Sequence, residues 1–136
     1  MKKPLLAAAV LAVLAASPGL AQTSADVKFE AGNYGTMVSG SITGNEYFDY
    51  TLGAKAGQEM FVELNVAGGN GNGSAFFNTL PPGSQGEAIF IGSMNDGNTA
   101  KIKLPQDGTY TIRVYLMGND KDAGKTVSYN VDISIQ

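Results

Sequence analysis

Three residues in this chain have side chains and positions suited to contact with another molecule: Tyr47, Arg113 and Tyr115. Each occupies an outward position in an alternating strand pattern, in which successive side chains point to opposite faces. Aromatic rings and guanidinium groups are enriched in the binding hot spots of proteins, and arginine donates paired hydrogen bonds to carboxylates. We therefore predict a partner-binding face around these residues.

A polar loop at residues 118–125 follows the strand of Arg113 and adds to this face. It supplies four further candidates for partner contact: Asn119, Asp120, Lys121 and Lys125. The same residues also allow a structural interpretation, in which Arg113 pairs with a neighbouring carboxylate and the tyrosines cover the sheet.

Several catalytic chemistries are excluded by composition, because the chain contains neither Cys nor His. It can form no Ser-His-Asp triad, no Cys-His pair and no imidazole zinc site. Most carboxylates lie in turns or on outward strand faces, so a hydrolase with two carboxylates in a cleft is a minor alternative. Asp120 and Asp122 weakly resemble a calcium loop, but Lys121 lies between them and Ca²⁺ needs six to eight oxygens. We expect no catalytic residues, no metal and no cofactor.

The glycine-rich segment at 67–74 (AGGNGNGS) is predicted to be a mobile loop. It is not a phosphate-binding loop, because no Lys-Ser/Thr pair follows the glycines and strands are expected on both sides.

Residues 1–21 have the pattern of a cleaved export signal. Lys2 and Lys3 precede an apolar run, and Gly19-Leu20-Ala21 forms the small-residue cleavage site. Mature protein is predicted to begin at Gln22 and to be periplasmic. The apolar run is shorter than the roughly 20 residues of a membrane-spanning helix, so membrane insertion is not expected. Residues 22–136 then form a single domain without disulfides.

Loss of Lys2 and Lys3 leaves 9 − 2 = 7 basic side chains against 12 acidic ones, a net charge of about −5. This balance disfavours nucleic acid and anionic lipid and favours encounter with a basic protein. Solubility alone also accounts for it.

Alternating apolar and polar residues predict an antiparallel β-sandwich of about eight to nine strands. The expected strands are 26–31, 36–43, 47–52, 60–66, 75–80, 87–93, 99–104, 110–117 and 127–135. Val27 and Phe29 are expected to face inward, and Gly40 to mark a bulge. The turn at 105–108 (PQDG) is predicted to close a hairpin between its flanking strands.

Several motifs in this order resemble the periplasmic inhibitors of g-type (goose-type) lysozyme. They are 27–29 (VKF), 40–44 (GSITG), Tyr47-x-x-Tyr50, 54–58 (AKAGQ), 112–120 (IRVYLMGND), 123–125 (AGK) and 129–133 (YNVDI). The resemblance implies a non-enzymatic protein that inserts loops into the substrate cleft of g-type lysozyme and so protects peptidoglycan. It also implies that Tyr47 and Arg113 occupy contact positions.

The 54–58 motif is also similar to bacterial pre-peptidase C-terminal domains, which share a related sandwich. The alternative is therefore a cell-envelope binding module that contacts glycan or protein. The sequence sets no oligomeric state.

Overall fold

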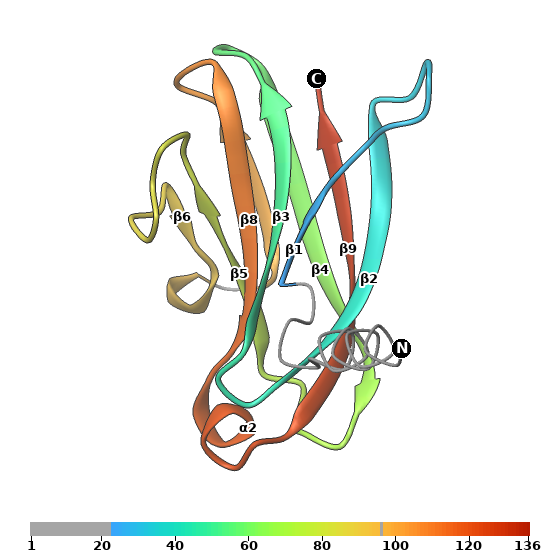
Figure 1. The fold of residues 1–136 in the computed structure, drawn as a ribbon, viewed down its shortest axis with the longest axis vertical. Helices are drawn as coiled ribbons and strands as arrows, with labels where there is room; N and C mark the ends of the chain where they lie inside the picture. Colours follow the sequence, from blue (N-terminus) through green and yellow to red (C-terminus); the bar gives the residue numbers. More distant parts are fainter. Residues whose placement is uncertain (1–22, 96) are drawn as a thin grey trace, which may run out of the picture.

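A computed structural model describes residues 23–95 and 97–136, and within that part of the chain nine strands form two sheets (Figure 1). The five-stranded sheet has the order β1 (Ser24–Asp26), β3 (Tyr47–Ala54), β8 (Gly108–Leu116), β5 (Ala75–Leu80) and β6 (Phe90–Ile91). The four-stranded sheet has the order β2 (Gly35–Thr43), β9 (Thr126–Ile135), β4 (Glu59–Gly69) and β7 (Thr99–Lys103). All described pairs are antiparallel except β1 with β3. The predicted all-β fold is confirmed.

The core lies between the sheets and is built by the alternation seen in the sequence. In β8 and β9 every second residue is buried: Tyr110, Ile112, Val114, Leu116, Val127, Tyr129, Val131, Ile133 and Ile135. Full burial of one such side chain contributes about 1.5–3 kcal/mol. The intervening polar residues therefore face outward, which places Arg113 and Tyr115 on the outer surface of the five-stranded sheet.

The predicted hairpin across residues 105–108 is wrong. β7 pairs with β4 in the four-stranded sheet, whereas β8 pairs with β3 and β5 in the other. The turn therefore carries the chain from one sheet to the other. A turn sequence specifies a local reversal, but it does not specify which strand supplies the next hydrogen-bond partners.

Some predicted boundaries also differ from the structure. The first strand is β1 rather than 26–31, although Val27 and Phe29 still pack against the core as partly buried residues. The strand expected at 87–93 is reduced to β6 and a 3-10 turn, η2 (Gly92–Met94). The loop expected at 118–125 contains one helical turn, α2 (Gly118–Asp122).

Gly40 does not mark a bulge, because β2 pairs with β9 without interruption from Gly35 to Thr43. The register shift lies instead in β4, between Val66 and Gly68. Glycine at position 40 makes room for a buried tyrosine pair, since a Cβ there would lie 2.7 Å from the Tyr129 hydroxyl. That hydroxyl lies 2.8 Å from the Tyr50 hydroxyl, and burial raises the pKa of both groups.

The export signal lies outside the described residues and stays a prediction. Among the residues that are described, no helix has the length and apolar character needed to cross a membrane.

Candidate functional site

The outer face of the five-stranded sheet carries two rows of side chains across β3, β8 and β5. Strand register places Tyr47 opposite Tyr115 and Tyr115 opposite Phe76, which we call the aromatic row. The next outward positions, Asp49, Arg113 and Asn78, form the polar row. Side chains directly opposite one another on neighbouring strands are close enough to interact. The rows therefore bring together residues that are far apart in the sequence.

Arg113 is held on several sides within the polar row. Its Nε donates to Asp49 Oδ1 at 2.8 Å and its Nη2 donates to Asp49 Oδ2 at 2.9 Å, a two-pronged ion pair. Nη1 donates to the backbone carbonyl of Gln85 at 3.3 Å, and the guanidinium carbon lies 4.2 Å from the centre of the Tyr47 ring. The hydrogen bonds to Asp49 raise the pKa of Arg113, against an opposing effect of partial burial. The arginine is therefore a fixed planar group.

Tyr115 fastens the segment after β5 to the sheet. Its hydroxyl donates to Asn78 Oδ1 at 2.7 Å and lies 3.2 Å from the Ser93 hydroxyl. The same Asn78 oxygen accepts the backbone N–H of Gly92 at 3.2 Å. Arg113 pairs with a neighbouring carboxylate and Tyr115 covers the sheet, as the structural interpretation predicts. Tyr47 differs, because it remains 46% exposed.

Asp120 has an internal role in the structure. Its side chain is only 1% exposed, and its two oxygens accept the backbone N–H groups of Asn72 at 2.7 Å and Ser74 at 2.8 Å. These hydrogen bonds, led by that of Asn72, lower the pKa of Asp120. The carboxylate is therefore directed at the glycine-rich loop and not at solvent. In the described residues no cluster of three or more acidic side chains is arranged to hold a metal ion.

The loops around α2 gather at one end of the sandwich (Figure 1), and backbone hydrogen bonds join them. Gly44 N–H donates to Lys125 C=O at 2.9 Å, Asn70 N–H to Thr126 C=O at 3.0 Å, and Met117 N–H to Ser74 C=O at 3.1 Å. The expectation that residues 67–74 are too rich in Gly and Asn to pack is therefore wrong, because β4 continues to Gly69 and the backbone of Asn72 and Ser74 is hydrogen-bonded to Asp120. This assembly presents Asn119 and Lys121 to solvent and leaves Lys125 partly exposed.

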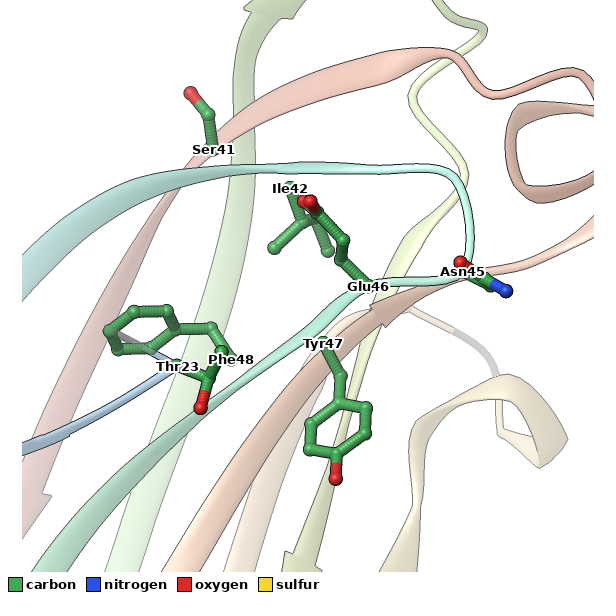
Figure 2. A pocket seen from close by; sticks show the side chains of 7 residues that line it. All are labelled: Thr23, Ser41, Ile42, Asn45, Glu46, Tyr47 and Phe48. Carbon is green, nitrogen blue, oxygen red and sulfur yellow. The ribbon is translucent and has the colours of Figure 1, made fainter. Parts of the chain in front are cut away.

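A pocket of about 430 Å³ lies on the other side of β3 from the Tyr47 ring (Figure 2). Its lining comprises Thr23, Ser41, Ile42, Asn45, Glu46, Tyr47 and Phe48. Glu46 is the one carboxylate in this lining, and its Oε1 accepts the Thr43 N–H at 2.9 Å. A pair of carboxylates, as most glycoside hydrolases use, is not present there.

Sequence reasoning missed four contributors to the site: Asp49, Phe76, Asn78 and Gln85. Alternation in β3 and β5 does place Asp49, Phe76 and Asn78 outward, so that signal was available. It does not state which outward residues are opposite Arg113 and Tyr115, because register depends on pairing between distant strands. Gln85 contacts Arg113 through its backbone carbonyl, which every residue has, so its side-chain type gives no sign of this contact.

Asp120→Asn is expected to lower the melting temperature at pH 7, because one backbone donor would then face an amide N–H₂ group. The folded-state pKa of Asp120 lies below its unfolded value of about 3.9. Its stabilisation is thus present above about pH 4 and is lost as the pH falls through the folded-state pKa. Melting curves from pH 7 downward should therefore converge for parent and variant. Asp122→Asn, which removes an exposed charge of the same sign, is the control. Equal melting of the Asp120→Asn variant and the parent at pH 7 would contradict this role.

No family model matches the sequence. Over 129 residues the chain is 31% identical to the inhibitor of g-type lysozyme of Escherichia coli strain K12, which covers 93% of this chain and 92% of that protein. The fold is similar to Aeromonas hydrophila PliG, a periplasmic lysozyme inhibitor of g-type lysozyme, with a TM-score of 0.74 and 35% identity over 84% of this chain and 96% of that one. For Salmonella Typhimurium PliG, described in the same words, the TM-score is 0.67 and the identity 27%, over 84% and 98% of the two chains.

Proposed function

Since this chain belongs to the family of inhibitors of g-type lysozyme, we propose that it binds such an enzyme in the periplasm and obstructs its substrate cleft. Two observations carry the proposal: the chain belongs to this family, and the Arg113 guanidinium lies against the Tyr47 ring to form one unit. The unit lies on the outer face of the five-stranded sheet, and Tyr47 is 46% exposed.

Chemical complementarity supports the orientation of the complex. A lysozyme is a glycoside hydrolase, and such enzymes generally carry acidic residues on either side of the scissile bond. A guanidinium has five N–H donors, of which three are used by Asp49 and Gln85. The two remaining donors can pair with carboxylates or carbonyls of the enzyme, while the Tyr47 ring supplies apolar contact area.

The α2 end is proposed to be the part that enters the cleft. It comprises α2, the β2–β3 turn and the glycine-rich loop, which the hydrogen bonds at Gly44, Asn70 and Met117 join into one unit. A pre-ordered loop loses little conformational entropy on binding, which favours affinity. Asn119, Lys121 and Lys125 are the proposed contacts here, whereas Tyr115 and Asp120 support the binding surface from within.

The net charge of the mature chain, about −5, supports encounter with a basic enzyme rather than a specific contact. Within the site the charge is partly balanced, because Asp49 pairs with Arg113 and Asp122 is next to Lys121 in the sequence. Affinity is therefore proposed to depend on shape and hydrogen-bond geometry. Long-range attraction is expected to affect mainly the association rate.

The aromatic row favours a second candidate, a module that binds envelope glycan, because sugar rings stack on flat arrays of aromatic side chains. Clearing of a peptidoglycan suspension distinguishes the two functions. We expect the purified mature protein to slow clearing by a g-type lysozyme and to leave c-type and i-type enzymes unaffected. Unchanged clearing by g-type enzymes, with co-sedimentation of the protein on peptidoglycan, would instead support the glycan-binding module.

A further inference from the structure

We infer that Asp49 is a positioning residue for lysozyme binding, which sets the plane and direction of the Arg113 guanidinium. The inference rests on the proposed function and extends it to a residue that does not itself need to touch the enzyme. It makes recognition dependent on the orientation of Arg113 rather than on the net positive charge of the face.

Asp49 fixes the plane of the Arg113 guanidinium. Asp49 and Arg113 are directly opposite in the register of β3 and β8, and their side chains are only 19% and 22% exposed. Two nearly equal hydrogen bonds, of 2.8 and 2.9 Å, join the carboxylate to Nε and Nη2 and hold the two groups in a fork. A single contact would let the guanidinium rotate, whereas the fork fixes its plane.

Asp49 also holds the Arg113 guanidinium beside the Tyr47 ring. Tyr47 and Asp49 are two residues apart on β3, so both side chains point to the outer face. The carboxylate thus draws the guanidinium toward β3, where its carbon lies 4.2 Å from the centre of the Tyr47 ring. Asp49 therefore arranges the exposed tyrosine and the arginine as one rigid unit before any partner arrives.

This arrangement makes a prediction opposite to that of simple charge attraction. Removing the charge of Asp49 makes the face more positive, so attraction to an acidic cleft alone would tighten binding. If Asp49 acts by positioning, its loss instead leaves a long side chain that must be ordered during binding, and affinity falls.

Asp49→Asn is the decisive variant, because the amide keeps the shape of the carboxylate but places an N–H₂ group against a guanidinium donor. We expect its affinity for a g-type lysozyme to fall about tenfold, mainly through faster dissociation. Glu30→Gln makes the same change in charge at an exposed position between β1 and β2, outside the proposed binding surface. That control is expected to bind as tightly as the parent or slightly more tightly. Surface plasmon resonance at two salt concentrations gives both rates, and melting curves report the stability of each variant.

A double-mutant cycle separates positioning from a general structural defect. If Asp49 acts only through Arg113, Asp49→Asn should cost no further affinity in an Arg113→Ala background. Equal or tighter binding by Asp49→Asn in the parent background, or a full tenfold loss in the Arg113→Ala background, would overturn the inference.

The same data test the proposed function separately. Absence of binding by the parent would contradict the proposed function itself, whereas full binding by Arg113→Ala would remove Arg113 from the binding surface and the positioning role of Asp49 with it. Normal inhibition by the parent and weak binding by Arg113→Ala, with an unaffected Asp49→Asn variant, would contradict the positioning role alone.

Discussion

Arg113→Ala is expected to weaken binding to a g-type lysozyme by about thirtyfold or more, equivalent to about 2 kcal/mol. The change removes the guanidinium together with its two unused N–H donors, and it leaves the Tyr47 ring without the cation that lies 4.2 Å from its centre. The Arg113 side chain is already ordered before binding, so its contacts with the enzyme cost little conformational entropy. Removing it therefore loses those contacts with little entropy gained in return. Calorimetric titration of the purified mature protein against the enzyme measures the loss directly.

The same substitution is expected to cost about 1 kcal/mol of folding stability. An outward-facing strand position by itself would predict a change within roughly 0.5 kcal/mol. The structure raises this expectation, because Asp49 is only 19% exposed on its side chain and would lose its ion-pair partner. Denaturant unfolding at pH 7 provides the measurement and shows whether the variant used for binding remains folded.

Arg113→Lys is the matched control for this result. Lysine keeps the positive charge but cannot form the fork with Asp49, so it should recover little of the lost affinity. Recovery to within about threefold of the parent would show that charge is sufficient and that the planar geometry does not matter. Parent-like affinity for Arg113→Ala would remove this residue from the binding site.

Gly69→Ala is expected to lower the free energy of unfolding by about 3 kcal/mol or more. A Cβ at this position would lie 2.2 Å from the backbone oxygen of Thr126 and 2.9 Å from the Cα of Val127. Its φ of 116° is also a conformation that residues with a Cβ rarely adopt. Neither contact can be relieved by a side-chain rotation, so β4 would have to separate locally from β9.

Thermal melting compares this variant with Gly53→Ala in β3. A Cβ at Gly53 would meet no atom within 4 Å, and its φ is not positive, so that change should be neutral or slightly stabilising. Because Gly69 precedes the loop held by Asp120, Gly69→Ala should also weaken lysozyme binding more than its loss of stability explains. Similar melting temperatures for the two variants would contradict the close approach of β4 and β9.

The all-β architecture, and the face on which most strand residues lie, can be predicted from the sequence alone. Side chains alternate along any strand, so apolar residues at every second position of β8 and β9 must face the core. The outward direction of Tyr47, Arg113 and Tyr115 follows from the same local rule. These predictions hold because they depend on covalent geometry and hydrophobic burial, which neighbouring residues already specify.

Which outward residues become neighbours depends on the tertiary structure. Asp49 meets Arg113, and Tyr115 stands between Tyr47 and Phe76, because β3, β8 and β5 adopt one particular register. Register is set by hydrogen bonds and core packing between strands that are distant in the chain, and a period-two pattern fits several pairings equally well. The turn at 105–108 joins two sheets for the same reason.

Asp120 shows the limit of local interpretation most clearly. In the sequence it is an acidic residue in a polar loop, which normally means a solvated side chain. In the fold it is buried, because Asn72 and Ser74, 48 and 46 residues away, donate backbone N–H groups to its oxygens. Its surroundings come from backbone groups of a glycine-rich loop, whose positions depend on how the two sheets pack and not on the residues adjacent to Asp120.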